Sequence, residues 1–353
     1  MSIKYNGGYI PAVGADGTTL VANSASATGV AWAGPSVAAG KNAIINGAME
    51  IAQRGITFTN PGNPAYTLDR WKAVSGANLY TITQSSSAPS GFIYSCSVAA
   101  TGSNSYMGLG QQIEYTQFYP LIGNAYVISF WAKSLTSNAA STALNVRQNI
   151  STSQDASNPS TDIQDNNFTL TTSWQKFSFT SSSTLLSAAS AKSLYLQFLL
   201  NQTVASGDGF AITGIQLELG SVPTAFSRAG GSIGGELALC QRYYWRWTAG
   251  ATYARFPSIG IAATSSQIHV GNNLPVTMRT TPAALDYGGS FRLYDLVNSP
   301  VTVSSMALIV STELSPEGWF YVTASSSSLV QYRMYSLSAS GDATAYVGFS
   351  AEL

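Results

Sequence analysis

Short runs in which apolar side chains recur at every second position appear throughout this chain, and they limit its fold more than any other feature. Residues 92–98 show this two-residue period, which is typical of a half-buried strand, and residues 174–179 and 194–200 repeat it. Residues 126–132 are apolar on both faces, which indicates a central strand. Polar, turn-rich segments separate these runs. The pattern predicts an all-β protein built as a sandwich or jelly roll.

A single helical pattern divides the chain into two β regions. Glycine dominates residues 229–235, which favours a linker, and Leu237, Cys240 and Tyr244 then follow at helical spacing. Glu236 lies at the start of this helix, where negative charge suits the helix dipole. The strand candidates after the helix are residues 258–263, 306–311, 319–323, 329–334 and 345–349. We therefore expect an extended N-terminal arm at 1–40, a jelly-roll β-sandwich at 41–228, a glycine-rich linker with a short helix at 229–242, and a second, smaller C-terminal β-sandwich at 243–353.

Charge is scarce in this sequence and evenly balanced. Charged residues make up 9% of the chain, against about 25% in an average soluble protein, and 16 basic residues offset 16 acidic ones. A nucleic-acid-binding protein needs a basic surface to displace the counterions of phosphates, and no run of lysine or arginine provides one. No stretch reaches the ~20 apolar residues of a membrane helix, and no secretory signal peptide is recognisable. We expect no nucleic-acid partner, no membrane insertion, and synthesis in the cytoplasm.

The side chains that most enzymes need are nearly absent. His269 is the only histidine and lies in a strand pattern, so a serine–histidine–aspartate triad would depend on it alone. Residues 230–234 match the letters Gly-x-Ser-x-Gly, but no buried strand runs into them as a nucleophile elbow requires. Cys96 and Cys240 cannot build a zinc cluster with one histidine, and we interpret both as small buried apolar residues. We expect neither enzyme activity nor a cofactor.

Glycoside hydrolysis is the enzymatic alternative that this composition leaves open, because it needs only two carboxylates. The available carboxylates are Glu114, Asp162, Asp165 and Asp208. Nothing in their spacing pairs them, and Asp162 and Asp165 lie in a segment that we interpret as a turn-rich loop.

Residues 69–71 (Asp-Arg-Trp) combine an aromatic side chain with two opposite charges. We interpret Trp71 as a core residue of the sandwich. Arg70 would then pair with a buried carboxylate such as Glu218 or Glu50. A glycan contact is the functional alternative for this motif.

Three oxygen-bearing side chains near the start of the jelly roll could hold a structural calcium ion. They belong to Asn42, Asn46 and Glu50. Their spacing is not that of a calcium-binding loop, so we expect no bound metal.

Five motifs, taken in order, resemble those of a known family. Residues 42–55 (NAIINGAMEIAQRG) and 66–71 (YTLDRW) open the first β region, and residues 215–221 (IQLELGS) close it. Residues 236–244 (ELALCQRYY) follow the linker, and residues 349–353 (FSAEL) end the sequence. Together, and over most of the chain, they are similar to the fibre and receptor-binding-type virion proteins of tailed bacteriophages.

This resemblance implies a jelly roll like that of carbohydrate-binding modules, followed by a smaller β domain. It also implies a place on the virion surface, as a tail or capsid appendage, and commonly a homotrimer. Residues 1–40 resemble the segment that precedes the first globular part, and we expect this arm to contact other virion proteins through Leu20, Val21 and Trp32. A flexible leader is the alternative, since the arm is rich in Gly, Ala, Ser and Thr and cannot form its own core.

Aromatic residues are the sequence's candidates for a sugar platform, because an aromatic ring can stack on the C–H face of a sugar. The glycan-binding candidates are Tyr243, Tyr244, Trp245, Trp247, Trp319 and Tyr321. The first four form the densest aromatic cluster of the chain. The structural alternative for this cluster is a strand that packs both of its faces, which the junction between two domains favours.

These inferences favour a tail-fibre or baseplate receptor-binding subunit that attaches to a glycan on the host surface. A capsid decoration protein or head fibre with a structural role is the alternative, supported by the arm and by the lack of a recognisable catalytic site. A glycan hydrolase is the third possibility.

Overall fold

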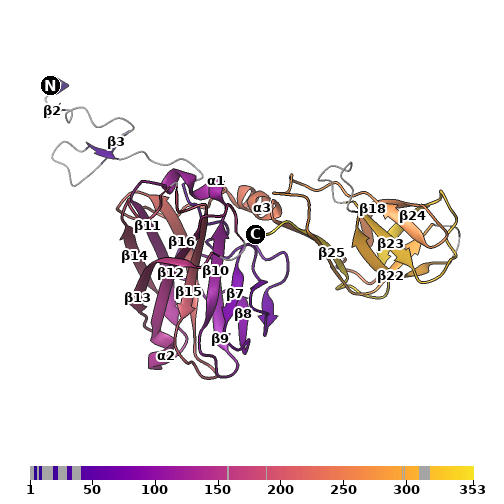
Figure 1. The fold of residues 1–353 in the computed structure, drawn as a ribbon, viewed down its shortest axis with the longest axis horizontal. Coiled ribbons are helices and arrows are strands. Elements are labelled where there is room, and N and C mark those ends of the chain that lie inside the picture. The colour runs from indigo at the N-terminus through magenta and orange to yellow at the C-terminus, as the bar shows by residue number, and fades with distance from the viewer. Residues whose placement is uncertain are drawn as a thin grey trace.

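The structure is a computed structural model that describes residues 41–156, 159–187, 189–295, 297, 299–309 and 319–353, together with the backbone of four short N-terminal strands. The chain forms a large and a small β domain with one helix between them (Figure 1). The all-β prediction is confirmed, because strands make up most of the regular structure. The longest helix in the described residues has nine residues.

The N-terminal strands form two separate pairs. Strand β1 (Lys4–Tyr5) pairs with β2 (Gly8–Tyr9), and β3 (Thr19–Ala22) pairs with β4 (Val30–Ala33). The second pair places the backbone of Leu20 opposite that of Trp32. The rest of the arm lies outside the described residues, and its role as an anchor stays a prediction.

The large domain is a jelly roll of two six-stranded antiparallel sheets. The first sheet, in spatial order, consists of β13 (Thr161–Thr169), β12 (Ala143–Ser151), β15 (Ser193–Leu200), β10 (Met107–Ile113), β7 (Lys72–Ser75) and β6 (Ala65–Tyr66). The second consists of β14 (Gln175–Ser181), β11 (Tyr126–Ser134), β16 (Gly209–Leu219), β9 (Ser95–Ala100), β8 (Tyr80–Ser85) and β5 (Thr57–Thr59). Single turns of helix occur at α1 (Tyr115–Phe118), η1 (Tyr119–Leu121) and α2 (Ala139–Thr142).

The core of the jelly roll lies between the two sheets. Phe130 is fully buried there and contacts Phe198 at 5.2 Å between ring centroids. Trp71 is also fully buried, as predicted, and lies 6.3 Å from Phe198. Cys96 is a free, buried thiol on β9, as the sequence indicated, and burial raises its pKa to about 12. The predicted strand at 92–98 begins later, at Ser95, because the preceding residues form a turn.

The small domain closes six strands into a barrel, beside which lies a three-stranded sheet. The barrel order is β18 (Arg255–Ala262), β19 (Gln267–Val270), β23 (Phe320–Ala324), β22 (Val301–Leu308), β21 (Phe291–Tyr294) and β24 (Met334–Ala339). The sheet order is β17 (Tyr244–Thr248), β25 (Tyr346–Ser350) and β20 (Ala284–Gly288). The domain therefore differs from the expected pair of stacked sheets, since closure of the barrel pairs its edge strands.

One predicted strand of this domain is absent. Residues 329–333 form a loop that leads into β24, although the sequence predicted a strand over 329–334. The loop is held to the strand next to it, because Tyr332 N donates to Ala262 O at 2.8 Å. Tyr332 also has a φ of 64°, which breaks the extended backbone that a strand requires.

The helix between the domains is α3 (Ile233–Gln241), which begins three residues before the predicted Glu236. The earlier start is set by Ser232, whose side chain accepts a hydrogen bond from Gly235 N at 3.1 Å. The Glu236 side chain lies buried in the first turn, and Cys240 lies buried in the last. Within the described residues no helix is long and apolar enough to span a membrane.

Candidate functional site

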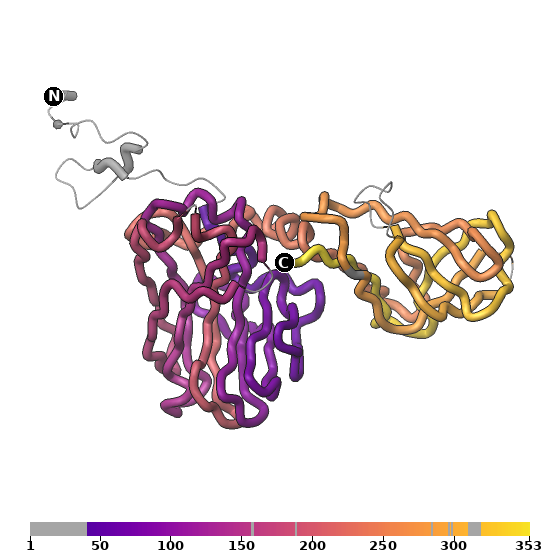
Figure 2. Tube along the Cα trace, in the orientation of Figure 1, coloured from indigo at the N-terminus to yellow at the C-terminus, as the bar shows by residue number. Residues whose placement is uncertain are grey.

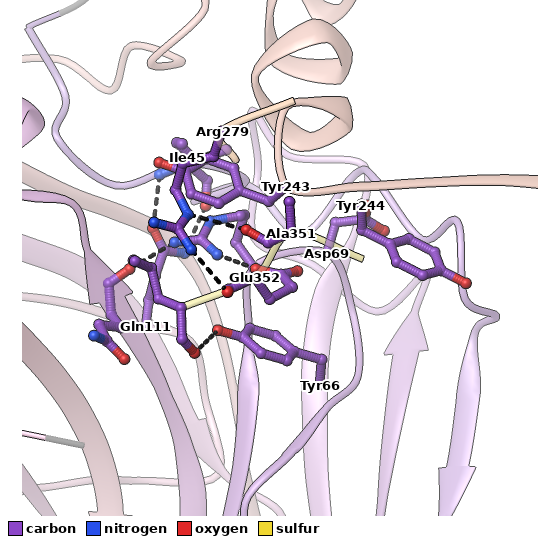
Figure 3. A network of polar contacts seen from close by, with 12 residues as sticks. Ile45, Tyr66, Asp69, Gln111, Tyr243, Tyr244, Arg279, Ala351 and Glu352 are labelled. Carbon is purple, nitrogen blue, oxygen red and sulfur yellow. Dashed lines mark hydrogen bonds and ion pairs between the residues drawn. The ribbon is translucent and has the colours of Figure 1, made fainter. Parts of the chain in front are cut away.

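Four of the five sequence motifs meet where the helix and the two domains join. The last residues of the chain return from the small domain to this junction (Figure 2). There Arg70 Nη1 binds the Glu352 carboxylate, and Arg70 Nη2 donates to Gln112 O at 2.7 Å. Arg279 Nε donates to Ala351 O at 2.9 Å (Figure 3). Residues from the start of the jelly roll and from the end of the chain are thus held in one polar network.

The partner of Arg70 differs from the predicted one. The predicted carboxylates, Glu218 and Glu50, are occupied by other groups: Glu218 lies 3.8 Å from Lys41 Nζ, and Glu50 accepts two hydrogen bonds of 2.6 Å from Arg228. Spacing along the sequence could not have identified Glu352, because it lies 282 residues from Arg70 and only the fold brings the two together.

The densest aromatic cluster belongs to this junction. Tyr243 and Tyr244 are fully buried beneath two guanidinium groups, with Arg70 3.5 Å from the first ring centroid and Arg54 3.4 Å from the second. Their hydroxyls donate to Glu114 and Asp286, each at 2.6 Å. Burial, more than any other cause, raises the pKa of both phenols. Neither ring offers a free face to a sugar.

Trp245 and Trp247 are half-buried in the small domain. The Trp245 ring lies 6.0 Å from Phe349, and the Trp247 ring lies 4.3 Å from Phe256. Both indoles pack against the core of that domain. The structure therefore gives this cluster the packed arrangement that the sequence left as the alternative to a sugar platform.

The residues considered for calcium and for hydrolysis already have protein partners. Asn42 and Asn46 bind backbone groups of the jelly roll. Among the described residues no group of three or more His, Cys, Asp or Glu side chains is arranged to hold a metal ion. Glu114 binds Arg242 and Tyr243, and Asp208 binds Thr136 and Asn138. Asp162 and Asp165 lie on strand β13 rather than in a loop.

The outer surface of the first sheet carries an ordered array of polar side chains. Along β12, alternate residues enter the core, and Asn145, Arg147 and Asn149 point outward. The strand registers extend these positions into three rows across the sheet. From β13 inward, the rows are Asn167–Asn145–Leu199–Gly108–Val74, Asp165–Arg147–Gln197–Gly110–Lys72, and Asp162–Asn149–Tyr195–Gln112. We call these residues the amide face.

A hollow of about 540 Å³ opens on the amide face, a volume typical of small-molecule sites. Tyr106, Tyr195, Arg147 and Gln197 are among its lining residues. Gly110 helps to shape it, because a Cβ atom at that position would come within 2.7 Å of the Tyr195 ring. Because Gly110 has no side chain, the Tyr195 ring of β15 can lie over the neighbouring strand β10.

The amide face has unused hydrogen-bonding capacity. Arg147 Nε donates to Asp165 Oδ1 at 3.1 Å, while the two Nη groups of Arg147 have no protein partner among the described residues. The Oδ1 atoms of Asn145 and Asn149 also lack a partner, but both are buried and closed to a ligand, so the accessible capacity of the face lies with Arg147.

A buried lysine ends the middle row of the array. Lys72 Nζ donates to Gln112 Oε1 at 3.0 Å and lies 5.1 Å from the centroid of the Tyr66 ring. Burial, with the nearby Arg70 charge, lowers the pKa of Lys72 to about 8. Near neutral pH this lysine therefore adds a positive charge at the edge of the amide face.

Of the amide face, only Asp162 and Asp165 were candidates from the sequence, and only as carboxylates for hydrolysis. The available signal was the alternation L-N-V-R-Q-N-I over residues 144–150, which places polar side chains at alternate positions of one strand. Its functional meaning appears only when the neighbouring strands are placed in register.

The last two predicted aromatic residues lie on the outer wall of the barrel. Trp319, just before β23, is 37% exposed, and Tyr321 on β23 is half-buried. Tyr321 is paired in register with His269 of β19, whose side chain is exposed. These two residues thus lie apart from the cluster at 243–247. Trp319 lines a groove on the barrel together with Ile259, Ile261 and Tyr332.

No protein-family model and no curated protein matches the sequence. Among solved structures, the chain is similar to one described as "CBM4 structure and function", with 16% identity and a TM-score of 0.34, over 50% of this chain and 98% of that chain. It is similar to the enzymatically active domain of tailspike protein 4 of bacteriophage CBA120, with 16% identity and a TM-score of 0.35, over 52% of this chain and 22% of that chain. It is also similar to the CBM22-1 xylan-binding domain of Paenibacillus barcinonensis Xyn10C, with 13% identity and a TM-score of 0.33, over 53% of this chain and 100% of that chain. Likenesses this distant do not assign a function.

Proposed function

We propose that this chain is a glycan-binding attachment protein and that the amide face is its binding surface. The observation that carries the proposal is the array of amide and guanidinium groups around a hollow that contains Tyr106 and Tyr195. Hydroxyl groups of a sugar can donate to and accept from amides, and the half-buried Tyr106 ring can stack on its C–H faces. Tyr195 is only 4% exposed and packs beside Tyr106, so it shapes the hollow rather than stacking on the sugar. Because a sheet holds these groups rigidly, little side-chain freedom is lost when a ligand binds.

We further propose that the chain acts on a virion surface, as a tail-fibre or baseplate subunit that recognises a host glycan as a homotrimer. The ordered motifs support this placement, and residues 1–40 are the proposed contact with other virion proteins. A capsid decoration protein or head fibre could carry the same motifs. Negative-stain microscopy of particles labelled with antibody against the barrel would show a label on the tail if the proposal holds, and a label on the capsid would replace it with the alternative.

Binding to purified bacterial surface polysaccharides tests the role of the amide face. Biolayer interferometry would compare the full chain with an Arg147→Met, Gln197→Ala double variant on immobilised capsule and lipopolysaccharide. We expect at least a roughly tenfold loss of affinity, which is the effect of about 1.4 kcal/mol of lost contacts. Arg333→Met is the matched control, because Arg333 is also a partly exposed arginine, paired with Asp295 at 2.8 Å in the barrel. Equal binding by the double variant and the control would contradict the proposal.

We propose binding without cleavage. Asp162 and Asp165, the carboxylates of the amide face, are hydrogen-bonded to Asn149 and Arg147. Incubation of the purified chain with the polysaccharide that it binds, followed by chromatography, is expected to release no oligosaccharide. Released oligosaccharides would show that the chain is a hydrolase.

A further inference from the structure

A groove of about 560 Å³ lies on the outer wall of the barrel, far in sequence from the amide face. Its floor is formed by Ile259 and Ile261, which point outward from β18 and are 62% and 53% exposed. Trp319 and Tyr332 also line it, and Tyr332 is 80% exposed. Large apolar side chains that lie together on an exposed surface mark a site that binds a ligand or another protein.

The backbone is unusual beside both aromatic rings of the groove. Gly271 lies directly against Trp319, since a Cβ atom there would come within 2.9 Å of the indole. Tyr332 has a φ of 64°, a conformation that a bulky side chain rarely adopts. Its backbone N–H donates to Ala262 O, which fixes the turn beside the groove. Strain kept at an exposed aromatic residue points to a role in binding rather than in packing.

The polar side chains that line the groove are few. Asn272 Oδ1 accepts from Ser258 Oγ at 2.7 Å, and its Nδ2 has no protein partner in the described part of the chain. The side chains of His269 and Asn273 make no hydrogen bond to any described residue. No Asp, Glu, Lys or Arg is among the lining residues that the structure describes. A ligand of this groove is therefore uncharged, has an apolar face and forms a few hydrogen bonds.

We propose that the barrel groove is a second binding site, specific for an uncharged saccharide whose C–H face stacks on Trp319 and Tyr332. The combination of exposed rings, an apolar floor and a few unpaired polar groups matches the general composition of small-ligand sites. A second copy of this chain is the competing occupant, since exposed isoleucines also suit a contact between proteins. The proposal is independent of the amide face, where charged groups take part.

Fluorine NMR on protein labelled with 5-fluorotryptophan tests this site directly. The chain has seven tryptophans, and the Trp319 signal is assigned by its loss in Trp319→Phe. Uncharged oligosaccharides of glucose, galactose, mannose, xylose and N-acetylglucosamine would each be added at about 10 mM, well above a weak Kd of roughly 1 mM. We expect at least one of them to shift the Trp319 signal while the signals of Trp71 and Trp245 stay unchanged. No shift with any of these sugars overturns the proposal.

Two variants separate binding from folding. Tyr332→Gly removes the ring at a position where the backbone already favours glycine, so we expect unchanged or higher thermal stability and about tenfold weaker binding. Tyr119→Ala is the control, because Tyr119 is 58% exposed on the jelly roll. A Trp319 signal that moves with protein concentration instead of with sugar, and sediments as a larger species, would assign the groove to a second copy. Tyr332→Gly protein that binds the sugar as tightly as the unmodified chain also contradicts the proposal.

Discussion

The junction and the amide face both contain arginines and amides, but they use them in opposite ways. At the junction, Arg70 and Glu352 are buried and paired, and Arg54 and Arg70 cover tyrosine rings. On the amide face, Arg147 is 25% exposed and uses only one nitrogen for Asp165. The junction groups are buried against one another and closed to a ligand, whereas the partly exposed Arg147 keeps Nη groups that a ligand can reach. This difference distinguishes residues that stabilise the fold from residues that are available to bind a ligand.

This difference also explains what the recognisable motifs encode. Residues 66–71 and 236–244 contain Arg70, Tyr243 and Tyr244, and all three contribute to the junction. None of the five motifs contains a residue of the hollow on the amide face. A binding surface outside the motifs can change its side chains while the joint between the domains stays the same.

The largest effect is expected from breaking the junction. Arg70→Met leaves the Glu352 carboxylate buried without its main partner, so we expect a loss of about 3–5 kcal/mol in the free energy of unfolding. Arg147→Met removes a pair whose two side chains are 25% and 41% exposed, and it should cost no more than about 1 kcal/mol. Urea unfolding followed by fluorescence measures both. Similar losses in the two variants would mean that the junction is not a special source of stability.

The next effect comes from filling the hollow. Gly110→Ala places a methyl group against the Tyr195 ring, which must move, so we expect a loss of about 1–3 kcal/mol in stability and weaker polysaccharide binding. Gly62→Ala is the control, because its Cβ would meet only Ala65 at 3.9 Å, and its effect should stay within about 0.5 kcal/mol. Thermal unfolding and interferometry provide the two readouts. A Gly110→Ala protein with normal stability and normal binding would show that the shape of the hollow does not matter.

A smaller, pH-dependent effect is expected from Lys72. Its pKa is about 8 in the folded chain and near its ordinary value of 10.5 in the unfolded chain, so the unfolded state holds more protons between these values. Stability attributable to Lys72 must therefore rise with pH in that window. We expect the unmodified chain to gain about 1–2 kcal/mol over Lys72→Met between pH 8 and pH 10, while contributions of cysteines and tyrosines cancel in the difference. Parallel stability curves for the two proteins would rule out a lowered pKa.

The smallest effect on stability is expected on the amide face itself. Arg147→Met removes a partly exposed ion pair, so its free energy of unfolding should change by no more than about 1 kcal/mol. The same variant should lose polysaccharide binding, which is the reverse of the junction variant. Denaturant unfolding and interferometry on one preparation make the comparison. A large loss of stability without a loss of binding would place Arg147 among the structural residues.

Much of the fold could be predicted from the sequence, but little of the site. The alternating runs predicted the all-β class, and the helical spacing located α3 to within three residues. Barrel closure was not predictable, because it depends on which strands pair and not on their individual patterns. Tyr243 and Tyr244 show why the site was harder to predict. The sequence shows that aromatic residues cluster there, but only the fold shows that both rings are buried and cannot contact a ligand. The amide face required the registers of five strands, which no local pattern contains.

Photo-crosslinking to an oligosaccharide tests the central claim most directly. The polysaccharide that the chain binds would be cut into short fragments, each carrying a photoreactive group, and the adducts would be located by mass spectrometry after irradiation. The amide face as binding surface predicts adducts on β12, β15 and β10, around Arg147 and Tyr195, that disappear in the Arg147→Met, Gln197→Ala variant. Adducts confined to the junction or to the second sheet of the jelly roll would contradict it.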